Sequence, residues 1–312
     1  MRIAFMGTPA FARPSLEKLI ESEEEIVAVI TQPDKPRGRG LKVSTSPIKT
    51  WAEAAGLFVF QPRSLKSPSF LEPLQELNPD LVLVVAYGKF LPETIINLPR
   101  LGCVNLHPSL LPKYRGAAPI QWALLNGETH TGVSTISMAR EMDAGDIFLQ
   151  RSIPIEPEDT YISLDEKLSR LAAQLVLETI SGLGRGELKP VPQRPEEVSL
   201  APRLKKEDGK IDWSKPASYI ERQVRALNPW PSSYTNWQGK LLKILEVRTV
   251  EGVSGERPGT VIAVMPPGWL VSCGQGDILV TLVQLENGKR MSAHDFSLGH
   301  KLAIGALLGE KR

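Results

Sequence analysis

The stretch Leu101-Gly-Cys-Val-Asn-Leu-His-Pro-Ser-Leu-Leu-Pro112 decides how this chain folds. It begins as an apolar run and reaches a histidine, after which Pro108 cannot continue the hydrogen-bond ladder of a sheet. The pattern predicts a buried strand that ends at His107. Because side chains alternate along a strand, Asn105 and His107 point to one face and Leu106 to the other. We therefore expect an amide beside an imidazole at the carboxyl end of a strand, where open α/β sheets bind their ligands.

A third polar side chain, Asp143, follows the strand-like run at residues 131–137. Gly145 supplies the backbone freedom for a tight loop that aims Asp143 back at the strand ends. An Asn, a His and an Asp on converging loops suit acyl or proton transfer. The pattern also fits residues with structural roles alone, in which His107 is a hydrogen-bonded, half-buried histidine and Asp143 forms a turn.

Strand and helix patterns alternate around this stretch. Residues 2–6 and 26–31 are expected as strands joined by an amphipathic helix at 11–21, an order that predicts a right-handed parallel crossover. The most apolar run, residues 80–86, predicts a central strand buried on both faces, and it ends at Tyr87-Gly88. The fold class expected is α/β, with a Rossmann-like, doubly wound, mostly parallel sheet. Further helices are expected at 47–56, 68–77, 117–126 and 163–183.

Several kinds of chemistry are disfavoured. The first turn, Gly7-Thr-Pro-Ala-Phe11, lacks the G-x-G-x-x-G pattern, so we expect no dinucleotide cofactor. The four histidines are scattered without ligand spacing, so we expect no metal. Cys103 and Cys273 lie far apart in apolar segments and are expected to be buried, reduced thiols. Ser109 lacks the G-x-S-x-G setting of an activated hydroxyl, which argues against a covalent acyl-enzyme.

The composition changes after residue 184, where prolines, glycines and charges predict a semi-rigid linker. Short apolar runs separated by turns then predict a small OB-like β-barrel. The domains expected are a catalytic domain at 1–189, a linker at 190–208 and a barrel at 209–312. Residues 201–312 carry 16 Lys and Arg against 11 Asp and Glu, a surplus of five positive charges. This sign fits a nucleic-acid partner, although a module for stability or dimerisation also fits.

A polar insertion at residues 32–46 carries four cations among glycines and prolines: Lys35, Arg37, Arg39 and Lys42. Such a segment cannot bury a core face, so it predicts a mobile loop above the carboxyl edge of the sheet. On its own the composition fits a solvated surface loop. Beside the expected site, however, the cations would suit a phosphate backbone.

No apolar run approaches the roughly 18 residues that a membrane helix requires. The amino terminus has the pattern of a first strand and not of a signal peptide. We therefore expect a cytoplasmic protein without membrane contact.

These motifs resemble the folate-dependent formyltransferases. The similarity is carried by Asn105-x-His107-x-Ser109-Leu-Leu-Pro112, by its continuation at 113–121, and by Met142-Asp-Ala-Gly-Asp146. It extends in order from residue 2 to beyond Trp230, and includes Gly7-Thr-Pro9, residues 31–40 and residues 84–88. Within the family the chain is most similar to members that act on initiator methionyl-tRNA.

The resemblance implies transfer of the formyl group of 10-formyltetrahydrofolate to the amino group of initiator methionyl-tRNA, for translation initiation, by a monomeric enzyme. It implies Asn105, His107 and Asp143 as catalytic residues. Folate contacts are implied at Val84, Ala86, Tyr87, Gly88, Ser109, Leu110, Leu111 and Pro112. Contacts with tRNA are expected from Lys35, Arg37, Arg39, Lys42, Lys205 and Lys206, with Arg39 the most important.

Formyl transfer explains the residue types. Negative charge develops on the formyl oxygen when the amine attacks, and Asn105 and a protonated His107 can each donate a hydrogen bond to it. One such donor is typically worth roughly 3 to 4 kcal/mol. Asp143 either keeps His107 charged or takes the proton of the amine through a water molecule, and the sequence leaves both roles open.

Three other functions stay open. The acceptor could be small, such as glycinamide ribonucleotide or an aminosugar nucleotide, which would require neither the basic barrel nor the insertion. Water as the acceptor would make the protein a formyltetrahydrofolate hydrolase. A non-enzymatic nucleic-acid-binding protein could retain a degenerate site, although the intact catalytic trio argues against it.

Overall fold

The structure, a computed structural model, describes residues 1–37, 42–252 and 255–309. The chain forms two compact units. The first unit comprises Met1–Pro119, His130–Pro154 and Leu164–Ala201, and the second comprises Ile120–Thr129, Ile155–Ser163 and Pro202–Arg312. Among the described residues, no helix has both the length and the apolar character needed to cross a membrane.

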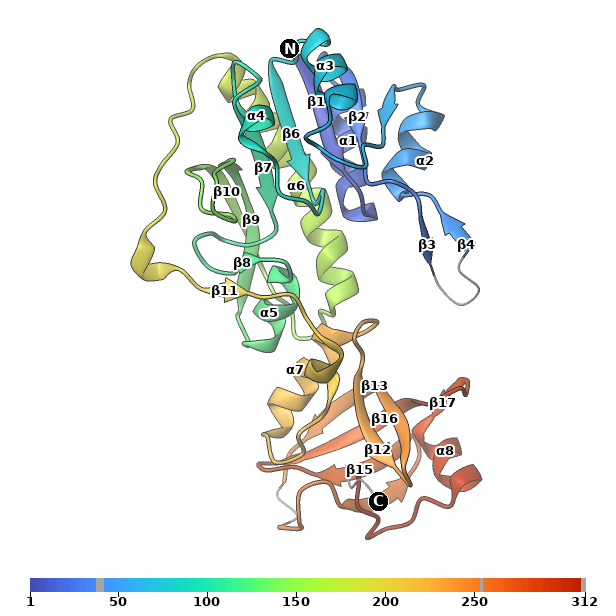
Figure 1. Cartoon of the computed structure of the whole chain (residues 1–312). Coiled ribbons are helices and arrows are strands. Elements are labelled where there is room, and N and C mark those ends of the chain that lie inside the picture. The colour runs from blue at the N-terminus through green and yellow to red at the C-terminus, as the bar shows by residue number, and fades with distance from the viewer. Residues whose placement is uncertain (38–41, 253–254, 310–312) are drawn as a thin grey trace. The chain divides into compact units, whose positions relative to one another are not determined.

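A seven-stranded sheet forms the first unit (Figure 1), in the order β10-β9-β7-β6-β1-β2-β5. Strands β5, β2, β1, β6 and β7 run parallel to one another. Beyond β7, strand β9 is antiparallel to β7 and β10 is antiparallel to β9. This confirms the predicted Rossmann-like, mostly parallel sheet. The strands are β1 (Arg2–Gly7), β2 (Glu25–Ile30), β5 (Val59–Phe60), β6 (Leu81–Val85), β7 (Cys103–His107), β9 (His130–Ser137) and β10 (Ile147–Pro154).

Helices cover both faces of this sheet. On one face, Met6 and Val84 pack against Phe70 of α3 and Ile95 of α4. On the other face, the buried Thr135 hydroxyl of β9 lies 2.9 Å from the Thr179 hydroxyl of α6. All five residues of β6 are buried, as predicted for a central strand. The helices of this unit are η1 (Ala10–Ala12), α1 (Arg13–Ile20), α2 (Pro47–Ala54), α3 (Pro68–Glu76), α4 (Glu93–Ile96) and most of α6 (Tyr161–Gly184), whereas all but the first residue of α5 (Pro119–Leu125) belongs to the second unit.

The insertion predicted as a loop contains a short antiparallel hairpin, in which β3 (Lys35–Arg37) pairs with β4 (Lys42–Ser44). The segments on either side of the hairpin are joined by a 2.7 Å hydrogen bond between the buried hydroxyls of Thr31 and Ser46. Because this bond holds the two flanks opposite each other, the polar segments beyond it can pair without a core of their own.

An ion pair strengthens the base of the hairpin. Lys49 Nζ lies 2.8 Å from Asp34 Oδ2, and Gln61 Nε2 donates to Asp34 Oδ1 at 2.7 Å. The Lys49 ammonium and then the Gln61 amide hold the pKa of the Asp34 carboxyl below its ordinary value. The hairpin is therefore anchored to α2 and to the sheet edge at its base.

The chain that follows α6 stays hydrogen-bonded to the first unit. Val191 and Ile147 exchange two backbone hydrogen bonds of 2.8 Å. Further on, after η2 (Pro195–Glu197), β11 (Leu200–Ala201) pairs in parallel with β8 (Arg115–Gly116). The stretch expected as a linker is thus attached to the first unit as far as Ala201.

The second unit is built on a six-stranded antiparallel sheet, in the order β12-β13-β16-β15-β14 with β17 beside β16. Its core includes the large side chains Trp213, Trp269 and Phe296. This confirms the predicted small β domain. Strands β12 and β17 were not predicted, because their sequences are largely polar. The elements are η3 (Lys206–Gly209), α7 (Ala217–Leu227), β12 (Ser233–Trp237), β13 (Lys240–Val250), β14 (Val261–Met265), β15 (Gly268–Ser272), β16 (Asp277–Leu285), β17 (Arg290–Ser292) and α8 (Ala293–His300).

Candidate active site

Strand β7 carries Asn105 and His107 to the carboxyl edge of the sheet. Across the β7–β9 ladder, Leu106 pairs with Thr135 and His107 with Ser134. Since Thr135 contacts α6, Leu106 faces this helix, and Asn105 and His107 point to the opposite face. The alternation predicted from the sequence is therefore what the strand displays.

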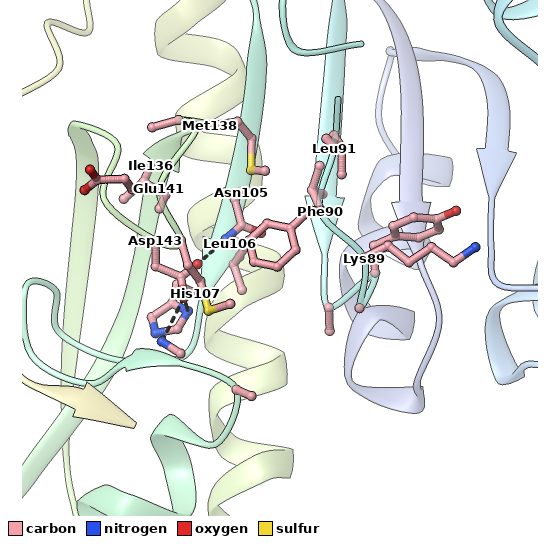
Figure 2. A pocket seen from close by; sticks show the side chains of 18 of the residues that line it. Lys89, Phe90, Leu91, Asn105, Leu106, His107, Ile136, Met138, Glu141 and Asp143 are labelled. Atoms are coloured by element: carbon pink, nitrogen blue, oxygen red, sulfur yellow. Dashed lines mark hydrogen bonds and ion pairs between the residues drawn. The ribbon is translucent and has the colours of Figure 1, made fainter. Parts of the chain in front are cut away.

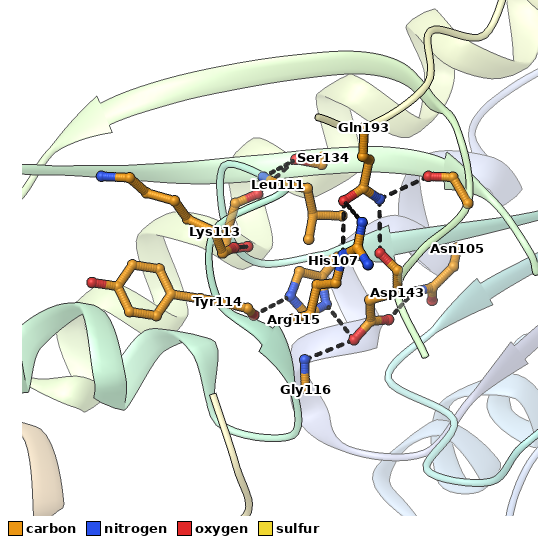
Figure 3. A network of polar contacts seen from close by, with 12 residues as sticks. Asn105, His107, Leu111, Lys113, Tyr114, Arg115, Gly116, Ser134, Asp143 and Gln193 are labelled. Atoms are coloured by element: carbon orange, nitrogen blue, oxygen red, sulfur yellow. Dashed lines mark hydrogen bonds and ion pairs between the residues drawn. The ribbon is translucent and has the colours of Figure 1, made fainter. Parts of the chain in front are cut away.

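Asp143 meets both residues from the loop after β9. Its Oδ1 accepts a hydrogen bond from Asn105 Nδ2 at 3.3 Å, and its Oδ2 accepts one from the backbone N–H of Gly116 at 2.9 Å. The same Oδ2 lies 3.5 Å from His107 Nδ1. One carboxylate thus contacts the amide, the imidazole and a backbone donor, and Figure 3 shows these contacts converging on it.

The other nitrogen of His107 fixes the orientation of the ring. Nε2 lies 2.9 Å from the backbone carbonyl oxygen of Tyr114. A carbonyl oxygen can only accept, so we assign a proton to Nε2. Nδ1 is then the nitrogen that faces Asp143, and it can donate only when the imidazole is charged.

Three residues in or near this cluster have a strained backbone. Ala86, Tyr114 and Asp143 adopt left-handed conformations, with φ of 50°, 64° and 52°. Such conformations cost of order 1 to 3 kcal/mol in residues other than glycine, and they gather at functional sites. Their convergence here is independent support for a site at this edge.

A cavity of about 410 Å³ opens beside the cluster. This volume falls within the range of about 300 to 1,000 Å³ typical of small-molecule sites. Figure 2 shows Asn105, His107 and Asp143 gathered on one side of it and Phe90 and Lys89 on the other. Its walls also include Val84, Ala86, Tyr87, Gly88, Leu91, Leu106, Pro108, Gly116, Ala117, Pro119, Ile136, Ser137, Met138, Ala139, Glu141 and Met142.

The residues expected to contact folate fall into two groups. Val84, Ala86, Tyr87 and Gly88 line the cavity. The segment Ser109–Pro112 lies outside this lining: Ser109 is fully buried, and its hydroxyl donates to the carbonyl oxygen of Lys113 at 2.6 Å. Folate contact by either group stays a prediction.

The cations expected to contact tRNA also divide by position. Lys35 is exposed on β3, and the backbones of Arg37 and Lys42 pair across the hairpin. Arg39 lies outside the described residues. In the second unit, Lys205 and Lys206 are exposed where η3 begins.

Two buried groups near the site are held neutral. Burial raises the pKa of the Tyr87 phenol and that of the Cys103 thiol to about 12 each. Neither group is therefore a proton acceptor or a nucleophile at neutral pH. Nowhere in the described ranges do three His, Cys, Asp or Glu side chains come together as metal ligands.

Several residues of the site were not predicted from the sequence, among them Phe90, Arg115 and Gln193. Phe90 lines the cavity although it is 69% exposed, and an aromatic residue just after a predicted strand end was a usable signal. Arg115 and Gln193 join the network around Asp143. No sequence pattern marks Gln193, which is 50 residues away from Asp143 along the chain.

Replacing Gly145 by alanine is expected to displace the loop that carries Asp143. A Cβ at this position would lie 1.7 Å from the carbonyl oxygen of Ser137, which is backbone and cannot move aside cheaply. We expect a loss of about 1 to 3 kcal/mol in the free energy of unfolding, together with a strong loss of activity. Urea unfolding and turnover measurements test this.

Gly184→Ala is the matched control, since its Cβ would meet only the end of Met1 at 3.5 Å. Unchanged stability and activity of Gly145→Ala would contradict the close approach of the loop.

Two family models match the chain. Residues 1–180 match the family described as formyl transferase, and residues 203–301 match the formyl transferase C-terminal domain. A methionyl-tRNA formyltransferase of Caldanaerobacter subterraneus subsp. tengcongensis is 47% identical over 309 residues, which make up 99% of this chain and 100% of that relative.

Two solved structures share the fold. HypX from Aquifex aeolicus, in complex with tetrahydrofolic acid, has a TM-score of 0.67 and 19% identity over 97% of this chain; the match spans only about half, 48%, of HypX. The sugar 3N-formyl transferase WlaRD, in the presence of dTDP and 5-N-formyl-THF, has a TM-score of 0.67 and 20% identity over 90% of this chain and 97% of its own. With both domain matches and the full-length relative, the chain belongs to the formyl transferase family.

Proposed function

We propose that this protein transfers the formyl group of 10-formyltetrahydrofolate to the free amino group of the methionyl moiety of initiator methionyl-tRNA, in the cytoplasm of a bacterial cell. The observation that carries the choice of acceptor is the 47% identity, over the whole chain, to a protein named methionyl-tRNA formyltransferase. The choice of donor is supported by the tetrahydrofolic acid and 5-N-formyl-THF named with the two structural neighbours.

The reaction would proceed beside the three polar side chains in the cavity. The amine attacks the formyl carbon and forms the new C–N bond, while negative charge develops on the formyl oxygen. An amide nitrogen has two N–H bonds, so Asn105 can donate one to Asp143 and one to this oxygen. The bond to N10 of the folate then breaks, N10 gains a proton and the amine loses one. Tetrahydrofolate and formylmethionyl-tRNA are the products.

His107 would stabilise the developing charge through Nδ1. Its Nε2 proton is directed to the Tyr114 carbonyl, so only Nδ1 of the charged ring can face the reacting group. Of the two roles left open for Asp143, we assign that of charge partner and orienting group. Both of its oxygens already accept N–H bonds, and its Oδ2 lies 3.5 Å from Nδ1.

The acceptor is tested directly by incubating the protein with 10-formyltetrahydrofolate that carries a labelled formyl group. Methionyl initiator tRNA, uncharged tRNA, free methionine and an aminosugar nucleotide are supplied in parallel. We expect label on the charged tRNA alone. Label on the small acceptors, or release of free formate at the same rate without any acceptor, would contradict the proposal and favour the sugar transferase or the hydrolase.

Replacing Arg39 by alanine is expected to weaken the use of methionyl-tRNA, because the loss of this cation removes an attraction to the phosphate backbone. The KM for methionyl-tRNA should rise about 10-fold or more, and its dependence on salt should become shallower. The KM for the folate should stay the same.

Lys66→Ala, which removes an exposed cation of the first unit outside residues 32–46, serves as the control for Arg39→Ala. If Arg39→Ala keeps the same tRNA dependence as Lys66→Ala, the role proposed for Arg39 is wrong.

A further inference from the structure

Residues 191–201, here named the strap, cross the loops that complete the candidate site. The strap first pairs with β10 through the two hydrogen bonds between Val191 and Ile147. At its other end, the Ser199 hydroxyl accepts a 2.9 Å hydrogen bond from the backbone N–H of Tyr114, and the Ser199 carbonyl accepts one of 2.9 Å from that of Arg115. The strap therefore holds the backbone whose Tyr114 carbonyl orients His107.

The strap passes very close to Gly116, whose backbone N–H donates a hydrogen bond to Asp143. A Cβ on Gly116 would lie 2.5 Å from the carbonyl oxygen of Ala201, and Gly116 has a φ of 129°. Only glycine fits both conditions without strain. The backbone N–H of this glycine donates to Asp143 Oδ2, so the strap also determines where that donor lies.

Gln193 is the side chain of the strap that reaches the catalytic loop. Its Nε2 donates to the carbonyl oxygens of Asp143 and Gly145, both at 2.7 Å. Its Oε1 accepts from Nε and Nη2 of Arg115, at 2.9 and 2.7 Å. Figure 3 shows Gln193 between the loop and Arg115.

The hydrogen-bond partners of the Gln193 side chain allow only one orientation of its amide. Arg115 can only donate and the two carbonyl oxygens can only accept, so the oxygen must face Arg115 and the nitrogen must face the loop. All four bonds are made by a half-buried side chain, and two of them involve a charged group, which strengthens them. A side chain that makes four hydrogen bonds is well suited to holding the loop at Asp143 in place.

We propose that Gln193 is a positioning residue for Asp143. It ties the carbonyl oxygens on either side of Ala144 to Arg115, which lies next to the donor Gly116. Asp143 itself has a left-handed backbone, which the loop must be held to keep. Gln193 does not contact the reacting atoms; it acts through Asp143, and the strap is thereby part of the active site.

The test compares Gln193→Ala and Gln193→Glu with the native protein. Glutamate keeps the acceptor for Arg115 but lacks both N–H donors and sets a charged oxygen against two carbonyl oxygens. We expect kcat to fall about 10-fold or more in both variants, with the KM for 10-formyltetrahydrofolate changed less than about 2-fold. Arg194→Ala is the control, since the Arg194 side chain is 73% exposed and pairs with Glu197. It should keep the native kcat.

A double-variant cycle separates positioning from a general structural effect. If Gln193 acts through Asp143, then Gln193→Ala should slow single-turnover transfer in the native background and cause no further loss in the Asp143→Ala background. Equal losses in both backgrounds, a native kcat for Gln193→Ala or a native kcat for Gln193→Glu would each overturn the proposal.

This inference rests on the function proposed for the site. The two fail differently: absence of transfer by the native protein would defeat the proposed function, whereas native transfer with an unaffected Gln193→Ala variant would defeat only the role of Gln193.

Discussion

Replacing His107 by alanine is expected to lower the rate of formyl transfer by about 10²- to 10⁴-fold, because the reaction loses the donor that faces the developing charge. The affinity for methionyl-tRNA should stay nearly unchanged, since the His107 side chain is buried, with 5% of it exposed. Single-turnover transfer measured with saturating folate reports the rate, and filter binding of the charged tRNA reports the affinity.

Two controls accompany His107→Ala. His294→Ala removes a histidine of the second unit and should keep full activity. Chemical unfolding checks the fold, because a buried side chain that bonds to the Tyr114 carbonyl is lost. A folded His107→Ala variant that retains more than about a tenth of the native rate would contradict the role of the ring.

Replacing Asp143 by asparagine is expected to lower kcat by about 10²-fold or more while leaving the KM for the folate close to the native value. The substitution keeps the shape but removes the charge beside Nδ1 of His107. It also sets an NH₂ group against either Asn105 Nδ2 or the backbone N–H of Gly116, both of which are donors. Steady-state kinetics with varied folate separates the two parameters.

Asp146→Asn is the matched control in the same loop. The contacts of Asp146 with Ser137 are made by the Asp146 backbone, so its amide should be tolerated. If Asp143→Asn proves as active as Asp146→Asn, the carboxylate charge plays no part in catalysis.

The sheet and the first two members of the trio could be predicted because their signals are local. The apolar residues of β6 and the alternation in β7 follow from burial and from the pleat of a strand. The same alternation correctly placed Asn105 and His107 on one face. Polar strands such as β12 were missed because pairing with β13, and not composition, makes them strands.

The rest of the site depends on contacts that no local pattern records. Tyr114 orients His107 through its carbonyl oxygen, which every residue type possesses. Gln193 lies in a proline-rich stretch that composition identifies as a linker, yet the fold brings it within 2.7 Å of the Asp143 carbonyl. Backbone acceptors and distant side chains of this kind become visible only when the chain is folded.

The role of this cavity in formyl transfer is tested most directly by a crystal structure of the protein with 5-formyltetrahydrofolate, a formylated folate. We expect the folate in the cavity walled by Val84 and Phe90, with its formyl group within hydrogen-bond reach of Asn105 Nδ2 and His107 Nδ1. A folate bound elsewhere, or one in this cavity with its formyl group directed away from Asn105, His107 and Asp143, would contradict it.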